Sequence, residues 1–172
     1  MRIELFQPTI EGEARLLLLI ERFSRGKNAL EGRTKLAKLD FFLRYPIYFR
    51  RALELRGFNI EKKFDFTIKE DIEAKMVRYR YGPWDPAYFA ILGRLIGKNL
   101  IIPVPIIKGI GYKATAKGRK VSNSLYIEPV WEETTAKIEL LKKYLNLKGY
   151  TLKKFIYDNF PEIASREWGE SL

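Results

Sequence analysis

The residue types that could carry out chemistry in this 172-residue chain are limited, because the sequence contains neither cysteine nor histidine. Ordinary structural zinc sites and the Ser-His-Asp or Cys-His arrangements of nucleophilic enzymes are therefore excluded. Gly109 and Gly111 are not followed by the Gly-Lys-Ser/Thr of a phosphate-binding P-loop. Asp65, upstream of Glu73 and Lys75, faintly resembles the acidic set of a metal-dependent nuclease, but the strand context is absent. We predict no catalytic residue, no metal site and no cofactor.

Basic side chains offer a second kind of chemistry, the binding of anions. The formal net charge is +11, and the segment from Pro86 to Ile127 contains no acidic residue. Clustered cations on a hairpin suit sequence-independent contact with the phosphate backbone of nucleic acid. The candidates for this contact are Lys108, Lys113, Lys117, Arg119 and Lys120. The alternative is a solvated basic face without a ligand.

A third candidate site combines arginine with tryptophan. Residues 77–81 alternate between apolar or aromatic side chains and arginine, which predicts a strand with Arg78 and Arg80 on one side. Paired guanidinium groups favour bidentate capture of a carboxylate or phosphate. Trp84 follows in a Gly-Pro turn, so we predict a partner-binding surface at Arg78, Arg80 and Trp84. The alternatives are a core position for Trp84 and internal salt bridges from the arginines to Glu70, Asp71 or Asp85.

The elements that must position these residues are mostly helices. Apolar periodicity, capping residues and glycine stops predict helices over 14–24, about 34–43, 47–56, 86–96, 115–125, 132–145 and 151–159. Strands are expected over 76–81, 100–107 and 112–114. Pro103 and Pro105 remove hydrogen-bond donors from the same side of the strand over 100–107, so we expect it to be irregular or to lie at an edge.

The order of these elements predicts a winged-helix fold. A set of helices is followed by a two-stranded wing, and the segment from Tyr112 to Lys120 is typical of the wing exit, with an aromatic strand, a threonine, a glycine three residues later and basic residues behind. We expect a single domain over 1–172 that is mostly α with a small β wing. Its winged-helix core spans about 30–125, with an extra N-terminal helix at 14–24 and a C-terminal helical extension over 130–160.

The helix expected over 86–96 occupies the position that reads the major groove in DNA-binding winged helices. Its only basic residue is Arg94, and the rest is largely apolar. Reading base edges requires arginine, lysine, asparagine or glutamine. We therefore expect a core helix, or a helix docked against a protein partner, rather than a reader of DNA sequence.

Two segments resemble a known family. "GRTKLAKLDFFLRYP" (Gly32 to Pro46) and "MVRYRYGPWDPAYFAILGRLIGKNLI" (Met76 to Ile101) resemble the middle component of ABC-three-component systems, which include Lamassu-type anti-phage defence. They are also distantly similar to the Panacea-type antitoxin domain. The resemblance covers about residues 30–125. It implies a small, non-catalytic partner of an SMC-like ATPase and of an effector, often a nuclease, and it supplies no catalytic residues.

Three functions follow from these observations. The first is an accessory subunit that bridges an SMC-like ATPase and its effector, in anti-phage or anti-plasmid defence. The second is a DNA-binding regulator or antitoxin of the winged-helix type, and the third is a nuclease that uses acidic residues. The longest early apolar run, Leu16 to Ile20, is too short to span a membrane, so we expect a cytoplasmic protein without membrane contact.

Overall fold

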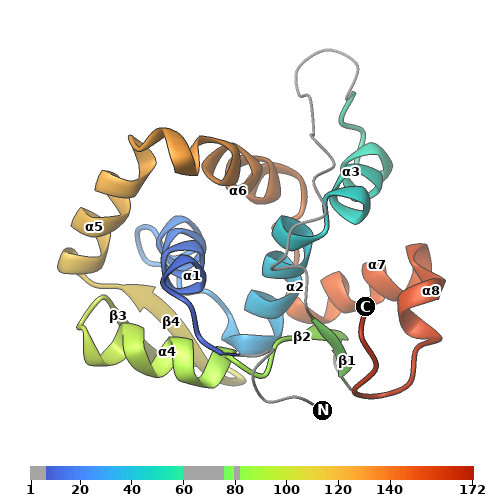
Figure 1. Cartoon of the computed structure of the whole chain (residues 1–172), viewed down its shortest axis with the longest axis horizontal. Helices are drawn as coiled ribbons and strands as arrows, with labels where there is room; N and C mark the ends of the chain where they lie inside the picture. The colour runs from blue at the N-terminus through green and yellow to red at the C-terminus, as the bar shows by residue number, and fades with distance from the viewer. Residues whose placement is uncertain (1–6, 60–75, 80–81) are drawn as a thin grey trace.

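The computed structural model describes residues 7–59, 76–79 and 82–172, which form mostly helices and two small antiparallel sheets (Figure 1). In chain order, the elements are α1 (Ile10–Phe23), α2 (Gly32–Arg44), α3 (Pro46–Leu55), β1 (Val77–Tyr79), β2 (Gly82–Trp84), α4 (Tyr88–Gly97), β3 (Ile101–Ile106), β4 (Gly109–Ala114), α5 (Ala116–Tyr126), the short 3-10 helix η3 (Pro129–Trp131), α6 (Glu132–Tyr144), α7 (Gly149–Asn159) and α8 (Pro161–Ala164). The prediction of a mostly α chain with a small β component is confirmed.

Helix α1 lies at the centre of the molecule, and other elements surround it (Figure 1). Its run from Leu16 to Ile20 is completely buried, and it contacts α2, α4, α5, α6 and β4. The side chain of Thr9 accepts a hydrogen bond from the N–H of Gly12 at 2.9 Å, so the helix begins at Ile10 rather than at residue 14. The helix expected as an addition therefore lies at the centre of the core, where several elements pack around it.

Strands β3 and β4 form a hairpin to which Leu30 adds a third, one-residue strand. The N–H of Leu30 donates to the carbonyl of Tyr112 at 2.9 Å, and the N–H of Tyr112 donates back at 3.0 Å. The N–H and the carbonyl of Tyr112 both bond to Leu30, so neither is available to β3. Pro103, which lies opposite Tyr112 on β3, is therefore at a position of the ladder without hydrogen bonds to β4. The missing N–H of Pro103 therefore faces the open side, which confirms β3 as an edge strand.

The hairpin leads into α5 through a junction that requires a glycine. The side chain of Thr115 caps α5 by accepting the N–H of Gly118 at 2.9 Å. A Cβ atom on Gly118 would lie 1.9 Å from the carbonyl oxygen of Leu100. The backbone of α5 therefore packs directly on the chain that enters β3, which no larger residue would allow.

Strands β1 and β2 form a second small sheet. The strand expected over 76–81 is β1, while Arg80 lies outside the described residues. Gly82 and Pro83 were expected to form a turn, but they belong to β2, where the backbone φ of 118° at Gly82 suits glycine. The C-terminal residues add a further strand, since the N–H of Arg78 donates to the carbonyl of Glu170 at 2.9 Å and Val77 bridges Ser171.

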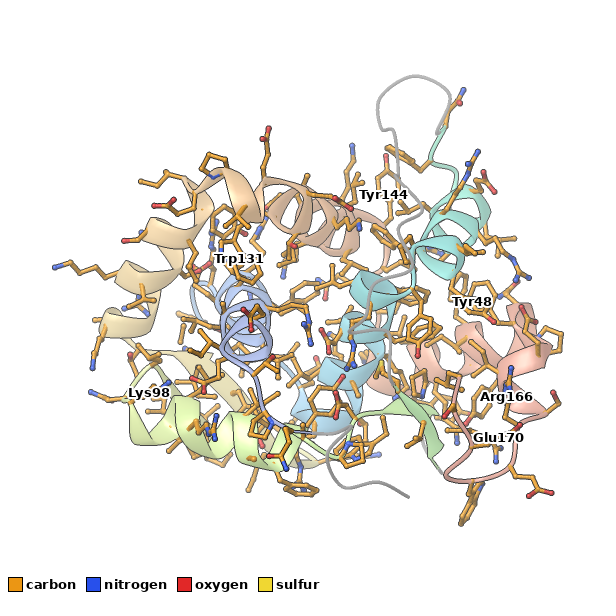
Figure 2. All side chains as sticks on the ribbon, in the orientation of Figure 1. Tyr48, Lys98, Trp131, Tyr144, Arg166 and Glu170 are labelled. Carbon is orange, nitrogen blue, oxygen red and sulfur yellow. The ribbon has the colours of Figure 1, made fainter. Side chains whose placement is uncertain are left out.

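The C-terminal helices belong to the same core as the rest of the chain. Ile138 and Leu141 on α6, Ile156 on α7, and Phe160 before α8 are completely buried. Phe160 packs edge-on against Phe42 of α2, with ring centroids 6.3 Å apart. In the segment that follows α8, Arg166 and Glu170 form an ion pair at 3.2 Å; Figure 2 labels both residues.

Candidate interaction surfaces

The outer side of α4 is apolar. Tyr88, Ile91, Leu92 and Leu95 face the core and are buried. On the opposite side, Phe89 is 59% exposed, Ile96 is also exposed, and Gly93 between them has open space around its Cβ position. This exposed side carries no asparagine, glutamine or lysine that could read a base edge from the middle of the helix.

The cations at the end of α4 are already engaged. Arg94 donates to the carboxylate of Glu13 at 3.4 Å and to the carbonyl of Pro8 at 3.3 Å. Lys98, which Figure 2 labels at the end of α4, forms an ion pair with the same carboxylate. Glu13 is itself buried, so its charge is held in place for these two partners. The exposed part of α4 therefore presents mainly hydrocarbon to solvent.

The tip of the β3–β4 hairpin continues this apolar surface. Ile107 is fully exposed and Ile110 is 57% exposed. Arg33, at the start of α2, joins the hairpin to α4: its guanidinium lies 4.5 Å from the centroid of the Phe89 ring, and the preceding Gly32 packs near the carbonyl of Ile110. We call Arg33, Phe89, Ile107 and Ile110 the hairpin face.

The five cations predicted to contact phosphates fall into two places. Lys108 lies in the hairpin turn, whereas Lys113, Lys117, Arg119 and Lys120 lie at the base of the hairpin and on the first turns of α5. Lys113 lies five positions after Lys108 along the extended strand β4, about 17 Å at the usual rise. The structure therefore does not bring Lys108 together with the other four.

Three of the four cations at the base of the hairpin donate to backbone carbonyls. Lys113 donates to Gly26 at 3.2 Å, Lys117 to Lys98 at 2.9 Å, and Arg119 to Ala114 at 3.1 Å. Lys120 is exposed. A cavity of about 380 Å³ opens beside Arg119, between the C-terminal end of α1, β4 and α5. Arg25, which follows the C-terminal end of α1, also lines this cavity. No sequence pattern linked Arg25 to α5.

The predicted partner-binding residues are only partly accessible. Arg78 is half-buried: its guanidinium lies 6.0 Å from the centroid of the Tyr157 ring, and its Nε is buried without a hydrogen bond. Trp84 is half-buried and packs edge-on against Tyr88, at 5.2 Å between ring centroids, and against Phe89 at 5.8 Å. Trp84 therefore supports the back of the hairpin face. Arg80 lies outside the described residues.

A buried ionic cluster links four segments of the chain. Asp40, in the middle of α2, accepts a hydrogen bond from Arg15 Nε at 2.6 Å and from the Tyr88 hydroxyl at 2.8 Å. Arg44 lies 3.6 Å from Asp40 and donates to Asp85 at 2.6 Å. Both aspartates lie in the two segments that carry the family resemblance, so these motif residues hold the core together rather than form an open site.

The protonation states of this cluster follow from its burial. Burial raises the pKa of Asp40, but the adjacent Arg15 and Arg44 outweigh this effect and hold it below its usual range. Burial and the Asp40 carboxylate raise the pKa of Tyr88 well above its usual value. The cluster therefore stays ionised at neutral pH, with Tyr88 as a donor. The feature of the sequence that could have indicated this buried cluster is Asp40, an aspartate inside the largely apolar run "KLDFFL".

Comparison of the chain with protein-family models, with curated proteins and with solved structures gives no match. Within residues 7–59, 76–79 and 82–172, no group of three or more carboxylates is placed to hold a metal ion. None of the helices in these ranges is both long and apolar enough to cross a membrane.

Proposed function

We propose that this chain is a non-catalytic subunit with a winged-helix core, and that it bridges an SMC-like ATPase and an effector in anti-phage or anti-plasmid defence. The fold part of the proposal is supported by the order α1, Leu30, α2, α4, β3, β4. A winged helix in which the short strand after the first helix pairs with the second strand of the wing would have this order, and Leu30 pairs with Tyr112 of β4. In this interpretation α1 is the first helix of the core, which the sequence predicted only over about 30–125, and α3, β1 and β2 are an insertion between the second and third helices.

The observation that carries the protein-binding role is the chemistry of the hairpin face. A helix that reads DNA needs polar side chains toward the bases, whereas α4 exposes Phe89 and Ile96 there. Aromatic and arginine side chains at the centre of a patch are typical of protein interfaces. Arg33 stacked on Phe89, together with the exposed Ile107 and Ile110 at the tip of the hairpin, is such a group. Arg94 and Lys98, the cations at the end of α4 that could have contacted DNA, form ion pairs with Glu13.

Co-purification with the proteins encoded beside this chain tests the proposal. We expect an ATPase with a long coiled coil to co-purify with the wild type. The double variant Phe89→Glu with Ile107→Glu should weaken this association by at least about 2 kcal/mol, the scale of a lost interface anchor. Both side chains are exposed, so the monomer should remain folded, which a melting curve checks.

Ile127→Glu with Val130→Glu is the matched control. These residues are 81% and 80% exposed and lie near the corner between α5 and α6, on the opposite side of the molecule from α4 (Figure 1). The control adds the same charge and should bind normally. Equal loss in both double variants, or a hairpin-face variant that binds like the wild type, would count against the assignment of this surface.

The second candidate, a winged-helix DNA-binding regulator or antitoxin, is favoured by one observation. Lys113, Lys117, Arg119 and Lys120 gather at the base of the hairpin, and residues 86–127 contain no acidic side chain to neutralise them. Such a group suits contact with phosphates and not with bases. A strong preference for one DNA sequence would favour this candidate over a bridging subunit.

A further inference from the structure

The cavity at the base of the hairpin is lined by residues from three separate segments. They are Glu21, Ser24, Arg25, Gly26, Ala114, Arg119 and Asn123. Its volume of about 380 Å³ falls in the range of small-molecule pockets. The cavity is larger than a bare phosphate ion needs, and it can take a phosphate group together with part of the molecule that carries it.

Internal contacts hold the cations of this cavity in place. Arg25 donates from Nε and Nη2 to the two oxygens of Glu21, at 2.9 and 3.0 Å. Arg119 uses only Nη1, toward the carbonyl of Ala114 at 3.1 Å. Lys113 is tied to Gly26, which itself lines the cavity. Because these side chains are ordered before a ligand arrives, binding costs less conformational entropy.

The balance of charge in the cavity favours an anion. Two guanidinium groups line it against one carboxylate, that of Glu21, and Lys113 adds a further positive charge nearby. Glu21 is buried and paired with Arg25, so its charge is compensated inside the protein. Both Arg119 and Asn123 line the cavity, and Arg119 uses only its Nη1 group for the contact with Ala114. A guanidinium fork with a neighbouring amide matches the several oxygens of a phosphate.

We propose that this cavity is a binding site for a phosphate group, carried either by a free nucleotide or by the backbone of a nucleic acid. Arg119 is the principal donor, and Arg25 compensates the charge of Glu21 so that this carboxylate does not repel the anion. The site does not depend on the proposed bridging role, because the hairpin face shares no residue with the cavity.

Titration calorimetry with ADP, with inorganic phosphate and with a short DNA duplex tests the site. The decisive comparison is between neighbouring cations on α5. Arg119→Gln should weaken binding at least about tenfold, the loss expected for charge-assisted hydrogen bonds. Lys120→Gln removes an equal charge from an exposed residue outside the cavity, and it should change the affinity for ADP less than about twofold. If only the overall positive potential of the protein attracted the anion, Arg119→Gln and Lys120→Gln would weaken binding equally.

The probes separate the sources of the phosphate. If ADP binds and competes with the duplex, the site is assigned to a nucleotide phosphate. If only the duplex binds, and Arg119→Gln weakens that binding, the site is assigned to a backbone phosphate. If Arg119→Gln lowers the melting temperature, Asn123→Asp serves instead, because it adds a repelling charge to an exposed cavity residue and keeps both arginines. The proposal fails if no probe binds, if binding is insensitive to the cavity variants, or if these variants and Lys120→Gln weaken the binding of ADP equally.

Discussion

Asp40 shows how one side chain can connect several elements. It is completely buried in α2, and its two oxygens reach Arg15 of α1 and Tyr88 of α4. Arg44 extends the contact to Asp85, whose other oxygen accepts the N–H of Ala87 at 2.8 Å just before α4. The cluster therefore fixes the relative placement of three helices that apolar packing alone would hold less specifically.

Asp40→Ala should destabilise the protein by about 3–5 kcal/mol, because it deprives a buried arginine of its carboxylate and leaves a buried tyrosine hydroxyl without an acceptor. Denaturant unfolding measures the loss. Glu139→Ala is the matched control, since Glu139 also accepts two hydrogen bonds from an arginine, Arg22, at 2.6 and 2.8 Å. That pair is exposed, so its loss should cost at most about 1 kcal/mol. Similar costs for the two variants would contradict this account of Asp40.

Lys38 predicts a pH dependence of stability. It is 2% exposed, its Nζ donates to the carbonyl of Thr34 at 2.9 Å, and burial, together with the charge of Lys153, lowers its pKa to about 8. Between this value and the unfolded pKa near 10.5, the unfolded chain binds more protons, so this residue makes stability rise with pH. Lys38→Met should remove that rise and stabilise the protein at pH 7 by roughly 2–3 kcal/mol.

The measurement for Lys38 is the free energy of unfolding at several pH values from 7 to 10. The difference between Lys38→Met and the wild type should shrink as the pH increases, since the wild-type lysine becomes neutral. Lys154→Met is a suitable control because the Lys154 side chain is 63% exposed on α7. A constant difference between Lys38→Met and the wild type would show that Lys38 is solvated.

At the scale of elements, the junction between the hairpin and α5 depends on close backbone contact. Gly118→Ala should destabilise the protein by about 2–3 kcal/mol or more, since the new Cβ would lie 1.9 Å from the Leu100 oxygen and the backbone would have to move. Gly93→Ala makes the same change in α4, where nothing lies within 4 Å of the Cβ position. It should stabilise by about 0.5–1 kcal/mol. Thermal unfolding of both variants checks the opposite signs.

Elements with strong local signals could be predicted from the sequence. Helix α6 follows from its acidic first turn and basic last turn, and α5 from the cap at Thr115. Pro103 and Pro105 indicated an edge strand because the missing donor is a local property. The pairing of Leu30 with Tyr112 could not be predicted, since a one-residue bridge has no periodicity.

Sites that combine distant segments were also beyond sequence patterns. Four of the five predicted cations lie together because they are close in the sequence. Lys108 lies apart from them because the extended strand β4 separates it from the base of the hairpin. Arg25 and Arg119 line the same cavity. They are far apart in the sequence, so no sequence pattern could predict that they lie together. The central place of α1 depends on helices that come at the other end of the chain.

At the scale of the whole molecule, the net charge of +11 governs encounters with polyanions. We expect binding to duplex DNA to be weak and indifferent to sequence, because α4 exposes Phe89 and Ile96 and its Arg94 is paired with Glu13. The affinity should fall steeply with salt, with a slope of up to about −4 if the four cations at the base of the hairpin each neutralise one phosphate. Titrations of two unrelated duplexes at several salt concentrations measure both properties, and tight binding to only one duplex would refute the expectation.

The central position of α1 also determines when the chain can complete its folding. The leucines of α1 are covered in part by α5 and α6, and the ion pair between Arg22 and Glu139 joins residues 117 positions apart. Closing so long a loop costs entropy before the contacts compensate, which slows folding. During synthesis the apolar run from Leu16 to Ile20 therefore emerges long before its partners do, and it is the segment that a chaperone would bind first.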